Sequence, residues 1–391
     1  MPTPTPKHYR TFNAPRFILK FNKGGEPLLS AFFRRYLPAS DLAKAEPLKT
    51  DAVLAFLEKK DDAGKDVTHL LNCAYDLGNL DGAFYLRIAA KNANVHPDPE
   101  SKLIPEHLSL KILNEHPAVF DRAYDRLGLA KTDNFNFYAG SRAVAIADPE
   151  TLANLFAARL RTLKKTPKIV VRHFVEAEMV NFIFYHESKP RAPLVMDDAL
   201  AMSPLWHRPT QQDFICYNTK TGHVEIEIGS RGEQVSIRKA FADVCAADAE
   251  FFDQPGSTAF LTLDHLLDPA FTLNPSIATL KGLVVKLDQD EAPSFEIKSK
   301  DVFATIERNG LRILFSDEPE SAAPPEIGMV AENSPNIPQG VEVTAATLSL
   351  VIPGARPTLI ELKAPNKVAF PRSMHTATIF ASLRALKLLK P

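Results

Sequence analysis

The chain has 391 residues, of which 24% are charged and 45% hydrophobic, and its formal net charge is −1. This composition is that of a globular protein and excludes fibrous and wholly disordered classes, while the balanced charge identifies no partner. The length exceeds the roughly 250–300 residues at which single cores stop growing, so we expect more than one domain.

The apolar pattern argues against membrane and secretory classes. No stretch reaches the roughly 20 apolar residues that a membrane-spanning helix needs. The N-terminal MPTPTPKHYRTF is not followed by the apolar region of a signal peptide. Cys73, Cys216 and Cys245 are too few and too widely spaced for a disulfide framework or a CxxC metal pair. We therefore expect a cytoplasmic protein that binds no membrane.

The first 25 residues contain four prolines and end at Gly24-Gly25, so we predict an arm that leads into a turn. Phe17 to Phe21 is predicted to form a short edge strand that anchors the arm. In residues 26–130, apolar side chains recur at spacings of three and four, which places them on one face of each of several helices. We predict a small helical domain there.

From residue 131 onwards, strand-like patterns alternate with helical ones. Asp148-Pro149 is typical of a helix start and predicts a helix to about Lys165. The segment from Asn218 to Gly222 lies between two alternating runs and predicts a hairpin turn. Ser236 is a candidate cap for a helix that ends at Phe252. Further strands are predicted at 168–175, 179–186, 213–217, 223–228, 283–287, 294–298, 302–306, 311–315, 341–352 and 358–363, and a last helix at 373–389.

These patterns predict an α+β protein, with a helical N-terminal domain followed by a larger mixed domain of mostly antiparallel strands. The predicted division is a basic arm over residues 1–25, a helical domain over 26–130 and an α+β domain over 131–391. Residues 316–339 are rich in Pro, Glu, Ser and Ala, so we expect a long loop or linker in this part of the chain.

Charge is distributed unevenly along the sequence. Residues 1–36 and residues 354–391 each contain seven basic side chains and one acidic side chain. Six basic residues and no acid lie between Arg159 and Arg172. Residues 240–342 hold 18 acids against 6 bases. The neutral total therefore conceals three basic segments and one acidic segment.

Three converging basic segments would form a patch suited to phosphates. Tyr9, Phe12 or Phe33 could add stacking on unpaired bases. The alternative is that each basic run is a solvated face or pairs with the acidic segment. The candidate nucleic-acid-binding residues are Lys7, Arg10, Arg16, Lys20, Arg34, Arg35, Arg159, Arg161, Lys164, Lys165, Lys168, Arg172, Lys367 and Arg372.

Two Glu-x-Lys triplets match part of the pattern of PD-(D/E)xK nucleases. In that arrangement, an acid on one strand and the Glu on the next strand hold a divalent cation, and the Lys orients the attacking water or the phosphate. Glu361 and Lys363 follow the strand that contains Glu342, and Glu296 and Lys298 form the second triplet. Neither triplet has Pro-Asp before it at the usual spacing, and an exposed cross-strand pair is the alternative explanation.

No other motif predicts an enzyme or a cofactor. The sequence lacks HExxH, GxxxxGK[ST] and GxGxxG, and it has no helix-turn-helix, zinc-finger or RNP-type pattern. We therefore favour a non-enzymatic binding or regulatory protein that uses no metal or cofactor and has nucleic acid as its partner. A metal-dependent nuclease is the first alternative, and a protein-interaction subunit of a larger complex is the second.

Overall fold

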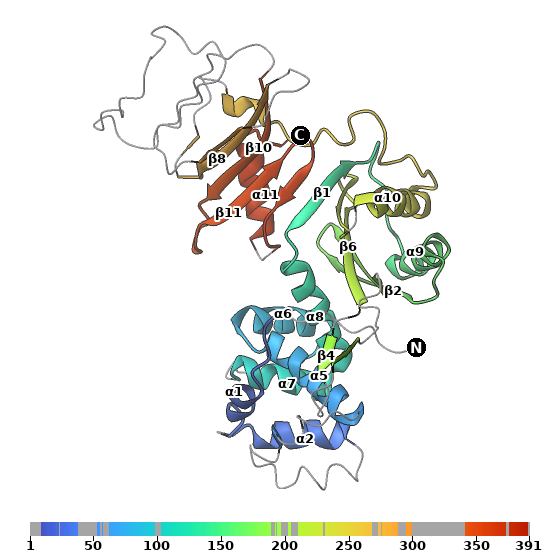
Figure 1. The fold of residues 1–391 in the computed structure, drawn as a ribbon, viewed down its shortest axis with the longest axis vertical. Helices are drawn as coiled ribbons and strands as arrows, with labels where there is room; N and C mark the ends of the chain where they lie inside the picture. Colours follow the sequence, from blue (N-terminus) through green and yellow to red (C-terminus); the bar gives the residue numbers. More distant parts are fainter. Residues whose placement is uncertain are drawn as a thin grey trace, which may run out of the picture. The chain divides into compact units, whose positions relative to one another are not determined.

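The computed structural model divides the chain into two compact units (Figure 1). We call Met1–Lys131 with Tyr185–Gln212 the helical unit, and Thr132–Phe184 with Asp213–Pro391 the sheet unit. Residues 185–212 thus group with the helices, whereas the sequence analysis placed them in the larger domain. The structure describes residues 9–22, 24–37, 53–54, 57, 62–97, 103–188, 192, 194–196, 202–204, 210–229, 231–267, 273–274, 276–287, 295–298, 341–372 and 375–389.

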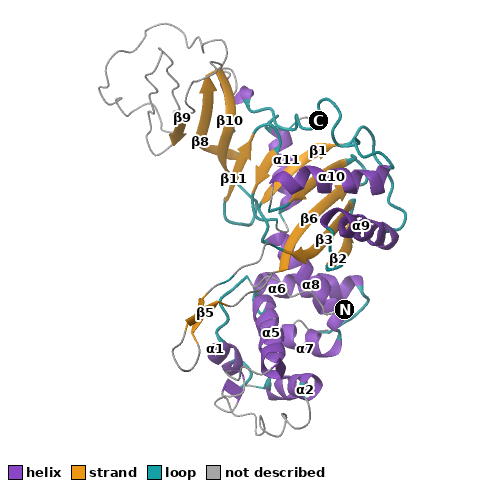
Figure 2. Cartoon of the chain, turned by 45° about the vertical axis from the view of Figure 1, so that its right-hand side comes forward, coloured by secondary structure: helices purple, strands orange, loops and turns teal. Residues whose placement is uncertain are grey.

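Amphipathic helices build the helical unit, as the spacing of apolar residues predicts (Figure 2). Pro27, Pro105 and Pro117 stand in the first turn of their helices, where an amide hydrogen is not needed for the helix ladder. Buried side chains from all these helices form one core. The helices are α1 (Ala14–Leu19), α2 (Glu26–Tyr36), α5 (Asp62–Leu77), α6 (Leu80–Asn92), α7 (Pro105–Glu115) and α8 (Pro117–Ala130).

The predicted edge strand at residues 17–21 is wrong, because this segment contributes to helix α1. The side chain of Asn13 accepts a hydrogen bond from the amide of Arg16 at 2.9 Å, and Pro15 follows in the first turn. These two features start a helix. Phe17 and Phe21 then lie one turn apart, with ring centroids separated by 5.2 Å in the buried core.

A ten-stranded sheet dominates the sheet unit within the described residues, in the order β2-β3-β6-β7-β1-β12-β11-β10-β8-β9 (Figure 1). Every strand pair with a described register is antiparallel, which confirms the α+β prediction. The strands are β1 (Asn134–Ala139), β2 (Ile169–Glu176), β3 (Met179–Glu187), β6 (Thr210–Asn218), β7 (His223–Glu227), β8 (Ala278–Leu287), β9 (Phe295–Lys298), β10 (Val341–Leu350), β11 (Thr358–Lys363) and β12 (Lys367–Ala369). Strands β4 (Leu194–Met196) and β5 (Met202–Pro204) form a separate hairpin.

Helices α9 (Pro149–Lys164) and α10 (Arg231–Ala246) pack on the β2-β3-β6-β7 half of this sheet (Figure 2). The Asp148 carboxylate caps α9 by accepting from the amides of Glu150 and Thr151, at 3.1 and 3.2 Å, which confirms the predicted start. Phe156 of α9 and Phe241 of α10 lie 5.5 Å apart by ring centroids, so the helices and the sheet share one buried core.

The predicted helix from Ser236 to Phe252 has both ends misplaced. Helix α10 begins at Arg231, because its buried face already includes Gln234 and continues through Ile237 and Phe241 at helical spacing. The helix stops at Ala246, since the next residue, Ala247, has a φ of 54° in the left-handed region.

The structure tests some of the remaining predicted strands and helices, and others lie outside the described residues. The hairpin of β6 and β7 and the long strand β10 are confirmed, and the last helix is shorter than predicted, at α11 (Thr376–Ala385). Strands β1 and β12 were not predicted. The predicted strands at 302–306 and 311–315 and the predicted loop at 316–339 lie outside the described residues.

Hydrogen bonds explain why residues 185–212 belong to the helical unit. The Tyr185 hydroxyl donates to the Asp125 carboxylate at 2.6 Å, and the Gln212 side-chain amide donates to the Tyr185 hydroxyl at 3.2 Å. The Tyr9 hydroxyl donates to the Gln212 carbonyl oxygen at 2.9 Å. This chain of bonds ties the two ends of the 185–212 segment and the N-terminal arm to helix α8.

The close packing around Gly128 gives a direct test of this tether. A Cβ at Gly128 would lie 2.7 Å from both Gln212 Nε2 and Tyr9 Oη. We expect Gly128→Ala to lower the free energy of unfolding by about 1–3 kcal/mol, measured by urea denaturation, because these groups must move. The matched control is Gly232→Ala on α10, where nothing lies within 4 Å of the new Cβ and stability should not fall. A Gly128→Ala protein as stable as the parent would contradict the tether.

Candidate nucleic-acid interface

Arg10 anchors the arm to helix α5. Its guanidinium donates to the Tyr75 carbonyl at 2.9 Å and lies 4.0 Å above the Tyr75 ring. The amides of Tyr9 and Arg10 donate to the buried Asp76 carboxylate at 3.1 and 2.8 Å, and the Tyr124 hydroxyl donates to it at 2.6 Å. Arg10 therefore has a structural role in the helical unit, whatever else it contacts.

The other predicted bases of the helical unit lie on helix surfaces or at helix ends. Arg16 and Lys20 are exposed, and the Lys20 ammonium lies 3.8 Å from the Glu106 carboxylate. Arg34 and Arg35 stand in the last turn of α2, where positive charge complements the helix dipole. The Arg35 guanidinium also donates to the Asn114 carbonyl. Lys7 lies outside the described residues.

Arg372, one of the predicted nucleic-acid-binding residues, lies in the interior of the sheet unit. Its side chain is 6% exposed, and its guanidinium lies 2.8 Å from the Glu225 carboxylate on β7. Four phenylalanine rings surround the guanidinium at 4.1 to 5.6 Å, namely Phe135, Phe137, Phe370 and Phe380. A surface phosphate cannot reach a cation enclosed in this way.

Burial dominates the electrostatics of this pair. It raises the pKa of Glu225, and the facing charge of Arg372 partly opposes that rise. Burial likewise lowers the pKa of Arg372, with Glu225 acting in the opposite direction. Each charge is therefore tolerated inside the protein because the other one is present.

The sheet keeps two predicted basic segments of this unit apart. Lys367 stands on β12, five strand spacings from β2 in the sheet order. At roughly 4.8 Å per spacing, this separation is about 24 Å. The 159–172 segment and Lys367 therefore belong to different parts of the sheet.

The Glu361-x-Lys363 triplet forms an ion pair on the strand surface. The Lys363 ammonium lies 2.8 Å from the Glu361 carboxylate, and both side chains are nearly half exposed. In the register, Glu361 faces Thr347 on β10, so Glu342 lies five residues along that strand. At about 3.3 Å per residue, the backbone of Glu342 is roughly 16 Å from the residue that faces Glu361.

The backbone register of the second triplet pairs it with strand β8. Glu296 faces Val284 and Lys298 faces Gly282, both on β8. Over the described ranges, no three His, Cys, Asp or Glu side chains gather as a metal site would require.

One predicted segment lies where helix α9 ends and strand β2 begins. We call it the α9–β2 corner and define it as Arg161, Lys164, Lys165, Lys168 and Arg172.

Helix α9 ends where Lys165 adopts the left-handed conformation, with φ 52° and ψ 39°. The Arg161 guanidinium donates to the Ile169 carbonyl at 3.0 Å and so links the last turn of the helix to the first residue of the strand. Lys165 and Lys168 are exposed beside this link.

Ion pairs to α10 neutralise part of the α9 charge. Arg159 lies 3.3 Å from Asp243, and Lys164 lies 3.0 Å from Glu233. Lys165 and Lys168 are exposed at the turn, and no acidic residue occurs from residue 151 to residue 175.

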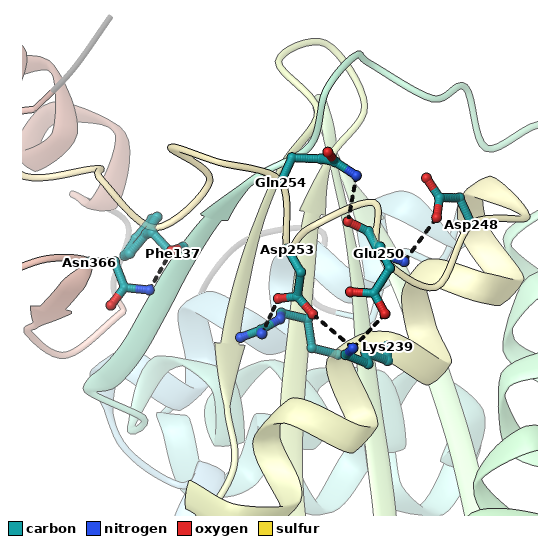
Figure 3. A network of polar contacts seen from close by, with 8 residues as sticks. Phe137, Lys239, Asp248, Glu250, Asp253, Gln254 and Asn366 are labelled. Carbon is teal, nitrogen blue, oxygen red and sulfur yellow. Dashed lines mark hydrogen bonds and ion pairs between the residues drawn. The ribbon is translucent and has the colours of Figure 1, made fainter.

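A polar network at the far end of α10 holds this helix in place (Figure 3). The Lys239 ammonium lies between the Glu250 carboxylate at 2.5 Å and the Asp253 carboxylate at 3.7 Å. Asp253 also pairs with Arg238, whose guanidinium lies 4.1 Å from the centroid of the Tyr138 ring. The network fixes the loop after α10 against the helix, and α10 in turn pairs with α9.

Comparisons with protein families and with curated proteins identify no relative of this chain. No protein-family model matches the sequence, and no curated protein is similar enough to identify a relative. Among the described residues, no helix combines the length and the apolar character that crossing a membrane requires.

The Arg372–Glu225 pair generates a stability prediction. We expect Arg372→Met to lower the free energy of unfolding by about 3–5 kcal/mol at pH 7, because the Glu225 carboxylate stays buried without its partner. The pKa of an unpaired, buried Glu225 lies above its unfolded value, so the folded state is favoured when this group is protonated. The loss in the free energy of unfolding caused by Arg372→Met should therefore become smaller as the pH falls from 7 toward 4.5.

A double-mutant cycle supplies the control for this prediction. The Glu225→Gln, Arg372→Met protein should regain much of the lost stability at pH 7, since it buries no unpaired charge. Urea denaturation at several pH values measures all four proteins. If Arg372→Met and the double variant lost the same free energy of unfolding at every pH, the role of Arg372 as the ionic partner of Glu225 would be contradicted.

Proposed function

We propose that this chain is a non-enzymatic nucleic-acid-binding protein that contacts phosphates through the α9–β2 corner. The observation that carries the proposal is the run of five basic residues where α9 turns into β2, with Lys165 and Lys168 exposed. Positive side chains that neutralise backbone phosphates release condensed counterions, and this release supplies sequence-independent affinity.

Hydrogen bonds order the turn at the corner. This order supports a binding role more strongly than a flexible basic segment would. The guanidinium of Arg161 is held by the Ile169 carbonyl, and the amide of Lys168 donates to the Thr166 hydroxyl at 3.2 Å. These bonds limit the conformations of the turn. A turn that is already ordered loses less conformational entropy when a ligand binds.

The proposal is tested by neutralising the two exposed lysines. We expect the Lys165→Gln, Lys168→Gln protein to bind an oligonucleotide more weakly, with the slope of log affinity against log salt reduced by about two. Fluorescence anisotropy titrations at several salt concentrations measure this slope. The matched control is Lys220→Gln, Lys281→Gln, which removes the same charge from two other exposed positions.

Two results would overturn the assignment of the corner. The first is that the parent protein binds no oligonucleotide, single-stranded or duplex, at low salt. The second is that the control pair lowers the affinity and the slope as much as the corner pair does, since net charge rather than the corner would then set the affinity.

A further inference from the structure

Strand β2 has two distinct faces, and one of them turns away from α9. Ile169 is buried in the core that α9 and α10 share with the sheet, and Val171 packs against the same core. His173 lies 3.7 Å from Glu150 in the first turn of α9. Since successive side chains of a strand point to opposite faces, Arg172 and Phe174 share the face that α9 does not cover.

This second face combines an aromatic ring with charged side chains at the edge of the sheet, basic at Arg172 and acidic at Glu176. β2 is the terminal strand in the order within the described residues, and Arg172 and Phe174 are half-buried. Lys168 precedes the strand at the same edge and is exposed. A partly exposed aromatic ring next to basic side chains has the composition of a surface on which bases stack while phosphates are neutralised.

We propose that the ligand of the α9–β2 corner is single-stranded nucleic acid, with one base stacked on Phe174. This inference rests on the proposed function, because the corner supplies the phosphate contacts. Duplex bases are stacked on each other and turn only their edges to a protein, so a ring on a strand cannot reach their faces. Unpaired bases offer their faces to aromatic side chains.

The experiment separates stacking from phosphate contact by using three probes with the intact protein. These are a 15-nucleotide oligothymidine, an abasic strand of the same length and a duplex of the same length. We expect oligothymidine to bind most tightly in anisotropy titrations. Phe174→Leu should weaken its binding about tenfold without changing the salt slope, and should leave binding of the abasic strand unaffected.

Two further variants keep the test independent of folding. Phe174→Trp retains an aromatic face and should bind oligothymidine at least as tightly as the parent. Phe84→Leu makes the same change at another half-buried phenylalanine, on α6, and should bind as the parent does. Thermal melting of all variants checks that each one is folded.

The outcomes distinguish the proposed base stacking on Phe174 from the proposed phosphate binding at the corner. If oligothymidine and the abasic strand bind equally, or the duplex binds best, the stacking assignment is overturned while phosphate binding at the corner stands. If polyglutamate displaces oligothymidine at equal charge concentration, the site recognises any polyanion and the inference is also overturned. If no probe binds, the proposed function itself fails.

Discussion

The buried ion pair of Arg372 and Glu225 joins the two halves of the large sheet in the sheet unit. Glu225 belongs to β7 and Arg372 follows β12, and β1 lies between these two strands. The pair therefore spans the junction between the two halves of the sheet. Around it, the Asn366 side-chain amide donates to the Phe137 carbonyl at 2.7 Å (Figure 3), and the Phe137 ring stacks on Phe260 at 4.5 Å. The ion pair adds a contact across a junction at which β1 and β12 pair over only three described residue pairs.

This arrangement also divides the basic residues by role. Arg372 neutralises an internal carboxylate, Arg10 anchors the arm, and Lys363 pairs with Glu361. The sheet order places the α9–β2 corner at the opposite side of the β7-β1-β12 junction from β11, at the terminal strand. A terminal strand has backbone and side chains that no further strand covers within the described residues, so the charge of the corner is positioned where an extended ligand can approach it.

The sequence predicts local features well and long-range pairing poorly. The Asp148-Pro149 start of α9 and the Asn218–Gly222 turn depend on neighbouring residues, so their patterns are sufficient. The strand β1 was missed because its six residues pair with β7 and β12, which lie about 90 and 230 residues later in the chain. For the same reason, nothing near Arg372 in the sequence indicates Glu225 as its partner. The corner could be predicted because all five of its bases fall within twelve consecutive residues.

We propose that nucleic acid contacts this protein at the α9–β2 corner. Hydrogen–deuterium exchange, compared between the free protein and the protein saturated with an oligonucleotide, tests it most directly. The account predicts slower exchange in peptides covering the last turn of α9 and strand β2, with little change around Arg372 and β12. Protection confined to the helical unit or to the β11–β12 region, with the α9–β2 peptides unchanged, would contradict it.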